Sequence, residues 1–330
     1  MAGGLLTGCK NGDWEFPDYT HTAAYFAYQS PIRTITLGED MSTDNTLDNE
    51  HKCRIIATMG GVYENKNNVE IGIEVDNSLC QGYKFTETDG DIEALPATHY
   101  TLSDEKIVIP GGQIMGGVTV NFTDAFFNDP KSTELHYVIP VVMTGVQNAD
   151  SILRGKPLVD NPSRLNKSDW EIQPKDYVLY AVKYISKYDS HYLRRGIDIY
   201  SGAKTGTEVR HQPYVEKDET VGGFSTLGLD KVKWTRTLKD VDGNNVTAEL
   251  ELSFDKDGNC TMASATDGIT ASGTGKFVEK GDKNSWGGKD RDVLYLDYTL
   301  DYSGIQCATK DTLVTHYRGV KAEWFTPVKK

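Results

Sequence analysis

Apolar and polar residues alternate over several short stretches of the chain, which is typical of half-buried β-strands. In Val69–Val75 every second side chain is apolar, so four apolar side chains would share one face of a strand. Six further stretches between residues 19 and 150 are rich in β-formers and bounded by Gly, Asn, Asp or Pro: Ala23–Tyr28, Cys53–Thr58, Tyr100–Leu102, Lys106–Gly112, Gly116–Phe122 and Tyr137–Met143. This spacing predicts a β-sandwich over residues 19–150.

The second half of the chain predicts consecutive β-hairpins. Apolar and polar residues alternate strictly between Val246 and Phe254, and the dipeptides Asp242-Gly243 and Asp257-Gly258 stand at the two ends of this stretch. Such dipeptides are strong signals for tight hairpin turns. Together with the alternating stretch Val293–Tyr302, they predict an up-and-down β-barrel of lipocalin type over residues 171–330, with Tyr177–Tyr184 as its first strand.

The segment between these two regions has a different character. Residues 150–175 contain three prolines and show no periodicity. We therefore expect residues 151–170 to form a linker between a sandwich domain at 19–150 and a barrel domain at 171–330. A length of 330 residues is consistent with two domains of ordinary size.

Charge limits the range of partners. The formal net charge is −13, which disfavours nucleic acids and anionic lipid surfaces, because both require clustered lysine and arginine. The longest apolar stretches are too short to span a membrane.

The first residues carry a candidate modification site. Residues 1–8 are uncharged, and Leu6-Thr7-Gly8-Cys9 has the form of a bacterial lipobox, in which small residues precede a cysteine that receives lipid. We interpret residues 1–8 as the remnant of a signal peptide, Cys9 as the lipidation site and the polar, acidic residues 9–18 as a tether. A chance occurrence of this tetrapeptide is the alternative. Acyl chains on Cys9 would anchor the protein to a membrane.

The other cysteines leave two alternatives open. Three disulfide pairings are possible among Cys53, Cys80, Cys260 and Cys307. The pairing of Cys53 with Cys80 and of Cys260 with Cys307 is the natural one, because it joins cysteines that are close in the sequence. Free, buried thiols are the other outcome. Neither a zinc-binding spacing nor a complete calcium loop is present. The acidic segments that begin at Asp240 and Asp255 have Asn245 and Cys260 at the sixth position, where calcium loops require glycine, and they are interpreted as hairpin turns. We expect no metal and no cofactor.

Aromatic residues provide the candidate ligand contacts. Trp234 and Trp324 lie in predicted strands and are expected to pack in the interior, whereas Trp286 lies in a polar, glycine-rich loop. Exposed aromatic rings flanked by Asn and Asp suit sugars, because the apolar ring faces stack while the hydroxyl groups form hydrogen bonds. The candidate ligand-binding residues are Trp286, Asn284 and Asp290, with Tyr188 and Tyr192 as a second aromatic surface if their loop lies at the same barrel end. The alternative is that Trp286 folds back as a lid on the barrel end.

Two regions resemble a known family. Residues 19–145 resemble the immunoglobulin-like N-terminal domain of Bacteroidetes surface lipoproteins, and residues 168–330 resemble the lipocalin-like domain that often follows it. The motifs that carry the first resemblance are Tyr100-Thr101-Leu102, Ile107–Gly112 and Tyr137–Pro140. Those that carry the second are Asp169-Trp170, Lys183-Tyr184-Ile185, Tyr192–Gly196, Gly273–Phe277 and Leu296–Thr299.

The resemblance implies an all-β protein with an immunoglobulin-like β-sandwich and a lipocalin-like β-barrel. It also implies a lipid-anchored glycan-binding protein on the outer face of the outer membrane, encoded beside a SusC/SusD-type glycan importer, with an oligo- or polysaccharide as ligand. The same N-terminal domain precedes family-18 glycoside hydrolase domains. The DxxDxDxE motif of that enzyme family is absent here, so no catalytic residue is carried over.

Two other functions are alternatives. A divergent glycoside hydrolase would need a pair of carboxylates at catalytic spacing, and Asp297 and Asp301 on one predicted strand would lie about 13 Å apart, which is too far. An adhesin-like interaction protein would need no sugar site.

Overall fold

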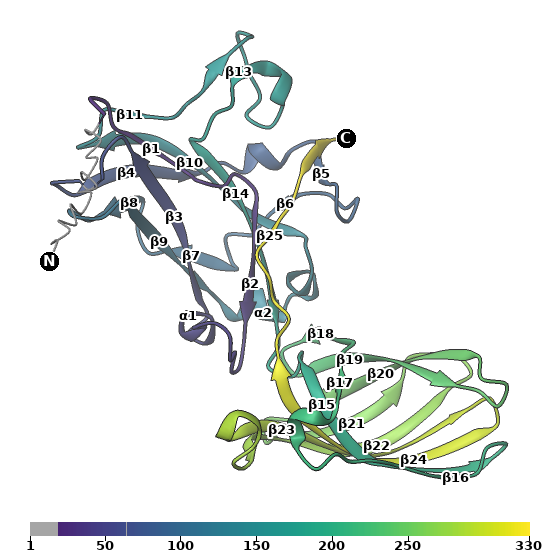
Figure 1. Ribbon diagram of the computed structural model, residues 1–330. Coiled ribbons are helices and arrows are strands. Elements are labelled where there is room, and N and C mark those ends of the chain that lie inside the picture. Colours follow the sequence, from purple (N-terminus) through teal and green to yellow (C-terminus); the bar gives the residue numbers. More distant parts are fainter. Residues whose placement is uncertain (1–18, 64) are drawn as a thin grey trace, which may run out of the picture.

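The computed structural model describes residues 19–63 and 65–330 and is almost entirely β-structure (Figure 1). The all-β prediction is therefore confirmed. Figure 1 shows two bodies, a sandwich domain above and a curled sheet below, which we call the barrel domain. The predictions for residues 1–8, Cys9 and the tether 9–18 lie outside the described residues.

Two sheets form the sandwich domain. The first has the strand order β11-β1-β3-β9-β7 and the second has the order β25-β2-β14-β10-β4-β8, with β6 paired to β10. Their bounds are β1 Ala23–Tyr25, β2 Pro31–Thr36, β3 Lys52–Gly60, β4 Val69–Val75, β6 Glu93–Ala94, β7 Tyr100–Leu102, β8 Lys106–Ile109, β9 Met115–Phe122, β10 Tyr137–Gln147, β11 Ser151–Ile152, β14 Tyr177–Ile185 and β25 Glu323–Trp324. Short helices accompany them: α1 Thr46–Asn49, η1 Asn77–Cys80, α2 Asp124–Asn128 and η2 Pro130–Thr133.

The alternation seen in the sequence places the sandwich core between these sheets. In β4, Val69, Ile71 and Ile73 are buried and pack with Ile55, Val118 and other residues of the facing sheet. The strand predictions from Cys53 to Met143 correspond to strands of the structure, with shifts of a few residues at their ends.

The predicted domain boundary at residue 171 needs correction. Strand β14 is not the first strand of the barrel: it lies in the centre of the second sandwich sheet, antiparallel to β10 and parallel to β2. Val178 and Val182 face the core between the sheets, while Leu179 and Ala181 face a second apolar cluster on the other side. Burial on both faces explains the nearly continuous apolar run of this strand.

The predicted linker 151–170 is also part of the sandwich domain. Strand β11 pairs with β1, β12 (Lys156–Pro157) pairs with β13 (Trp170–Ile172), and η3 spans Lys167–Asp169. The side chain of Leu165 is buried in the second apolar cluster with Phe85 and Phe325. The segment is therefore a mostly exposed excursion of the sandwich, fixed by these strand pairs and by Leu165, and does not separate the two domains.

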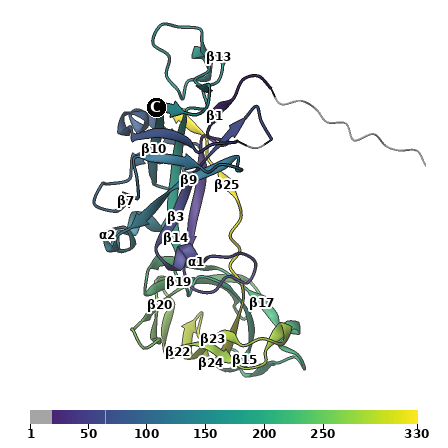
Figure 2. The same cartoon turned by 90° about the vertical axis from the view of Figure 1, so that its left-hand side faces the viewer.

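The C-terminal segment returns from the barrel to the sandwich, as Figures 1 and 2 both show in yellow. Strand β25 pairs with β2, and β26 (Pro327–Lys329) pairs with β5 (Tyr83–Phe85). Phe325, between these strands, packs edge-on against Phe85 with ring centroids 4.9 Å apart. The chain thus crosses between the domains twice, near residues 186 and 319.

The barrel domain is one curled sheet with neighbouring strands in the order β16-β15-β24-β23-β22-β21-β20-β19-β18, and β17 pairs with β15. The bounds are β15 His191–Gly202, β16 Gly206–Arg210, β17 Glu219–Val221, β18 Phe224–Gly228, β19 Lys231–Lys239, β20 Asn245–Phe254, β21 Asn259–Ser264, β22 Thr270–Asp282, β23 Arg291–Tyr302 and β24 Ile305–Tyr317, with η4 Val215–Lys217 and η5 Trp286–Gly288. From β18 to β24 each strand pairs with the next, as in the predicted up-and-down meander.

The predicted hairpin turns are present. The carboxylate of Asp240 accepts hydrogen bonds from the backbone N–H groups of Asp242 and Asn244, and Asp255 does the same for Asp257 and Asn259. Gly243 has a φ of +82°, which favours glycine. The barrel interior is filled with apolar and aromatic side chains, among them Trp234, as predicted.

One end of the barrel is docked on the sandwich. Because the strands alternate in direction, the loops at 186–190, 255–258 and 283–290 lie at the same end, and the hairpins at 240–244 and 303–304 lie at the other. At the docked end the backbone N–H of Ser186, the residue directly after β14, donates to the hydroxyl of Thr226 in β18 over 2.9 Å. The sandwich therefore covers the barrel end at which the ligand was expected.

The four described cysteines are free and buried, so the predicted alternative of unpaired thiols is the one the structure shows. Burial raises the pKa of the Cys53 thiol to about 12. Within the described residues, no helix has the length and apolarity needed to cross a membrane.

Candidate functional site

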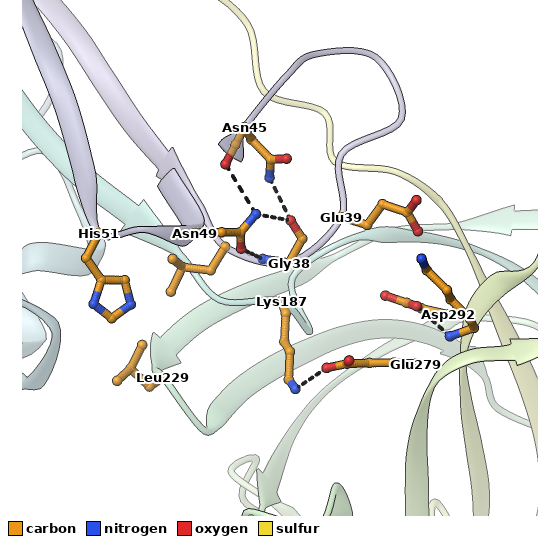
Figure 3. A pocket seen from close by; sticks show the side chains of 11 residues that line it. Gly38, Glu39, Asn45, Asn49, His51, Lys187, Leu229, Glu279 and Asp292 are labelled. Carbon is orange, nitrogen blue, oxygen red and sulfur yellow. Dashed lines mark hydrogen bonds and ion pairs between the residues drawn. The ribbon is translucent and has the colours of Figure 1, made fainter. Parts of the chain in front are cut away.

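A cavity of about 820 Å³ lies where the two domains meet (Figure 3). We call it the interdomain cavity. Its lining comes from the segment between β2 and β3 on the sandwich side, and from the loop after β14, the end of β18 and the β22–β23 hairpin on the barrel side. The lining residues are Leu37, Gly38, Glu39, Asn45, Asn49, His51, Lys187, Leu229, Glu279, Lys280 and Asp292. Its volume lies within the range of small-molecule sites in proteins, about 300–1,000 Å³.

Two asparagines build the sandwich wall of the cavity. The side-chain amides of Asn45 and Asn49 both donate to the Gly38 carbonyl, and the Gly38 N–H donates back to Asn49 Oδ1 over 2.8 Å (Figure 3). Gly38 has a φ of +85°, and a Cβ on it would lie 2.6 Å from Cβ of Lys187. A glycine is required here because the backbone turns into the left-handed region and also touches the other domain.

Helix α1 is held in place from beneath this wall. The buried carboxylate of Asp48 accepts a hydrogen bond from the Thr36 N–H over 2.9 Å and pairs with the guanidinium of Arg33. These bonds join α1 to β2, the strand that precedes the cavity segment. The backbone that bears the Asn45 and Asn49 side chains is therefore held in place against β2.

Charged groups form the barrel wall. Lys187 Nζ lies 2.8 Å from Glu279 Oε1, and both side chains are partly solvated. The carboxylate of Asp292 is buried and accepts a hydrogen bond from the Lys280 N–H over 2.8 Å. Burial raises the pKa of Asp292, and the negative charges of Glu39 and Glu279 act in the same direction.

The chemistry of the cavity suits a polar ligand. Three carboxylates and two lysine ammonium groups face it, together with two amides, the His51 imidazole and two leucine side chains, whereas its lining contains no Phe, Tyr or Trp. Such groups can form many hydrogen bonds to hydroxyl groups but offer no ring for stacking. No group of three or more His, Cys, Asp or Glu side chains in the described residues is arranged to hold a metal ion.

The structure places Trp286 on the outside of the barrel sheet, near the docked end. Its indole packs beside Leu193, Val293 and Val314, and its N–H donates to the Thr315 carbonyl over 3.0 Å. The Arg291 guanidinium lies 3.6 Å from the centroid of the indole ring. The ring is half-buried and folded back against the protein, but on the outer face of the sheet and not as a lid on the barrel end.

Asn284 and Asp290 lie in the same hairpin as Trp286. The backbone N–H of Asn284 donates to Asp290 Oδ1 over 3.0 Å, and the other carboxylate oxygen of Asp290 pairs with Lys283. None of these residues lines the interdomain cavity. Their role in ligand binding stays a prediction that the packing of this hairpin does not support.

The predicted second aromatic surface needs correction. Tyr188 and Tyr192 are 4% and 0% exposed and belong to the barrel core. The ring of Tyr188 stacks on Phe254 with centroids 3.6 Å apart, and the Tyr192 hydroxyl donates to the Tyr188 carbonyl. Both rings are covered by the protein's own side chains, so they offer no surface to a ligand.

The sequence reasoning missed the cavity residues of the sandwich domain. Glu39, Asn45, Asn49 and His51 lie in a stretch between two strands that is dense in Asp, Asn, Ser and Thr and looks like an ordinary loop. The density of hydrogen-bonding side chains there is a signal that could have indicated a site. The barrel half of the cavity is distant in sequence and becomes visible only in the fold.

Comparisons with known proteins also divide the chain into two regions. Residues 18–150 match a family model described as an N-terminal domain, and residues 187–319 match a model described as a domain of unknown function (DUF5627). The second match begins and ends where the chain enters and leaves the barrel. The protein is thus an all-β protein with a sandwich domain and a curled-sheet domain.

A crystal structure of a Bacteroides ovatus structural-genomics protein of unknown function is 48% identical to this chain. It superimposes with a TM-score of 0.86 and covers 95% of this chain and 100% of its own. The chain belongs to the same family as this Bacteroides ovatus protein.

A second Bacteroides ovatus structure, provisionally described as a carbohydrate-binding protein, is 11% identical, covers 92% of this chain and 97% of its own, and superimposes with a TM-score of 0.28. That similarity is too low to support an argument about fold or function. No curated protein matches the chain.

Proposed function

We propose that this protein binds a neutral oligosaccharide in the interdomain cavity and does not cleave it. The observation that carries the proposal is the cavity itself: about 820 Å³, formed by both domains, with polar or charged side chains on eight of its eleven lining residues. Sugar hydroxyl groups donate and accept hydrogen bonds, and carboxylates, amides and ammonium groups are matched partners for them.

The charge of the cavity favours a neutral ligand. Glu39, Glu279 and Asp292 outnumber Lys187 and Lys280, and the whole chain carries a formal charge of −13. A uronate or another acidic sugar would be repelled both at a distance and in the cavity. Neutral glycans avoid this cost.

We place this binding at the cell surface of a Bacteroides-type bacterium. The support is the Leu6-Thr7-Gly8-Cys9 motif, whose cysteine would carry the lipid, and the resemblance to surface lipoproteins encoded beside SusC/SusD-type importers. In this account, the protein holds glycan close to such a transporter.

A panel of oligosaccharides tests the proposal. Isothermal titration calorimetry would use neutral fragments of starch, mannan, xylan and mixed-linkage β-glucan beside acidic fragments of polygalacturonate. The proposal expects micromolar to millimolar binding of at least one neutral fragment, with the acidic fragments weaker or silent. Binding confined to polygalacturonate would contradict it.

One observation favours a second candidate function, a divergent glycoside hydrolase. Asp292 is a carboxyl group with a raised pKa in a cavity that holds two further carboxylates, and glycosidases draw their general acid from such groups. Release of reducing sugars from the same panel by the wild-type protein, abolished in Asp292→Asn, would establish this function instead of simple binding.

A further inference from the structure

Two exposed aromatic side chains from opposite ends of the sequence lie side by side on the sandwich domain. Tyr28 is 60% exposed and Trp324 is 51% exposed. Their ring centroids are 5.5 Å apart and their planes are tilted by 48°. We call Tyr28 and Trp324 the aromatic pair. Trp324 was expected to pack in the interior, and its exposure corrects that prediction.

The backbone holds Trp324 in this position from both sides. Strand β25 pairs with β2, with Trp324 opposite Pro31. The next residue, Phe325, is buried, and its N–H donates to the Ser30 carbonyl over 3.0 Å. Because neighbouring side chains in extended backbone point to opposite sides, the burial of Phe325 directs the indole of Trp324 outward.

Tyr28 is fixed in the same way. Phe26 is buried and its N–H donates to the Lys175 carbonyl over 2.9 Å, while the carbonyl of Gln29 accepts a hydrogen bond from the Leu179 N–H over 2.7 Å. The segment that carries Tyr28 is thus attached to β14 and to the backbone just before it. The aromatic pair is preorganised, which lowers the entropic cost of binding a ligand.

The polar atom of Trp324 is unused. The indole N–H groups of Trp170, Trp234 and Trp286 each donate to a backbone carbonyl, at distances of 2.7, 3.2 and 3.0 Å. The indole N–H of Trp324 forms no hydrogen bond with any described residue. Tryptophan N–H groups usually find a partner when they are covered, so this donor is available to a ligand that stacks on the ring.

We propose that the aromatic pair is a second saccharide-binding surface, on which pyranose rings stack against Trp324 and Tyr28 while a sugar hydroxyl accepts the Trp324 N–H. This inference rests on the proposed function and extends it. A sugar combines an apolar ring face with hydroxyl groups at its edge, and the pair presents two tilted aromatic faces with an unused donor.

The size of the surface favours a sugar over a protein partner. An aromatic side chain buries about 150–250 Å², whereas a stable protein interface buries roughly 1,600 Å² in total. The neighbours of the pair along the chain include Gln29, Glu323 and Thr326, which are polar. Two exposed rings offer only a fraction of the area that a stable protein interface needs.

Two contact points on one protein would retain a long glycan better than either alone. Once one segment of a polysaccharide occupies the interdomain cavity, a second segment of the same chain can reach the pair at a raised effective concentration. The pair is therefore expected to matter more for polysaccharides than for short oligosaccharides.

Affinity electrophoresis in gels that contain starch, yeast mannan, xylan or mixed-linkage β-glucan tests the inference. The proteins are the wild type, Trp324→Ala, Tyr28→Ala and Trp324→Phe. Tyr214→Ala serves as the matched control, because Tyr214 is an exposed tyrosine of the barrel domain. A further variant, Leu229→Trp, places a bulky side chain at the wall of the interdomain cavity and leaves the pair intact.

The inference expects Trp324→Ala to bind the retarding polysaccharide at least fivefold more weakly than the wild type does. Tyr28→Ala should also bind more weakly than the wild type, Trp324→Phe should have an affinity between those of Trp324→Ala and the wild type, and Tyr214→Ala should bind as the wild type does. Full retardation of Trp324→Ala and Tyr28→Ala, while Leu229→Trp loses it, would overturn the inference and leave the proposed function standing. If the Trp324→Ala and Tyr28→Ala proteins lose retardation while Leu229→Trp keeps it, the inference is supported and the cavity is not the binding site. If no gel retards the wild type, both are contradicted.

Thermal unfolding of each variant separates loss of binding from loss of folding. If Trp324→Ala unfolds at a lower temperature than the wild type, the retardation of Trp324→Phe and Tyr28→Ala decides whether the aromatic pair binds saccharide. Unchanged retardation of these two variants would overturn the inference. Dimerisation of the wild type that the Trp324→Ala change abolishes would also overturn it, because the pair would then be a protein interface.

Discussion

The guanidinium of Arg318 donates a hydrogen bond to the backbone carbonyl of Leu37, over 2.5 Å, across the boundary between the two domains. The same guanidinium donates to the carbonyls of Ser186 and Asp189, at 2.6 and 2.8 Å. One buried cation thus joins the segment directly after β24 to both the sandwich and the first crossover between the domains. It fixes the domain arrangement that creates the interdomain cavity.

Replacing Arg318 by lysine should destabilise the protein by about 3 kcal/mol, because a single ammonium group cannot reach three carbonyls and leaves buried acceptors without donors. Differential scanning calorimetry of the full chain would measure the loss. Lys321→Ala, an exposed change three residues further on, should leave the unfolding temperature unchanged. An Arg318→Lys protein as stable as the wild type would show that this contact does not hold the domains together.

Trp286 should contribute to stability. Its indole packs on the outer apolar cluster, donates to Thr315 and lies against Arg291. We expect Trp286→Phe to lose about 1 kcal/mol through the missing hydrogen bond, and Trp286→Ala about 2 kcal/mol through lost packing and cation–π contact. Urea unfolding measures both.

Lys289→Ala, in the same hairpin, is the control for Trp286. If Trp286→Ala keeps its stability but loses glycan binding, the original prediction of Trp286 as the ligand contact is correct and the packing account is not.

Asp292 should make stability depend on pH. Its pKa in the folded protein lies above the ordinary value of 3.8, chiefly because of burial, so the folded state binds a proton more tightly than the unfolded state does. Stability from this group is therefore fully present below the unfolded-state pKa and is lost as the pH rises through the folded-state pKa.

Asp292→Asn should consequently be more stable than the wild type at pH 7, since the amide oxygen can still accept from the Lys280 N–H. The gain should shrink as the pH approaches 4. Urea unfolding at several pH values measures it, with Asp257→Asn in an exposed turn as the control. A gain independent of pH would contradict the assignment.

Cys9 should determine membrane attachment. In a Bacteroides host, the protein is expected to partition with membranes and to take up a fatty-acid probe, and Cys9→Ala is expected to be released. Equal membrane association of the two proteins would show that the Leu6-Thr7-Gly8-Cys9 motif is fortuitous.

The alternation of apolar and polar residues predicts where strands lie in the sequence, but it does not predict which strands pair with one another. The strand Val69–Val75 is predictable because one of its faces is buried, so apolar and polar residues alternate along it. Strand β14 was assigned to the wrong domain, because a strand buried on both faces carries no sign of which sheet receives it.

The candidate sites depend on contacts that no local pattern contains. The interdomain cavity combines Asn49 with Asp292, which are far apart in the sequence. Trp324 and Phe325 look alike in the sequence, and only the return of the C-terminal segment to β2 and β5 buries one and exposes the other. The burial of Tyr188 and Tyr192 follows from packing against Phe254, Phe277 and Phe224 within the barrel.

The central claim, that the interdomain cavity holds the ligand, is tested most directly by calorimetric titration of the tightest-binding neutral oligosaccharide of the panel into Leu229→Trp and Leu227→Trp. The two leucines are 38% and 37% exposed and lie two residues apart, but only Leu229 lines the cavity. The account predicts that Leu229→Trp weakens binding at least tenfold, about 1.4 kcal/mol, and that Leu227→Trp binds as the wild type does. Equal affinity of the two variants would contradict it.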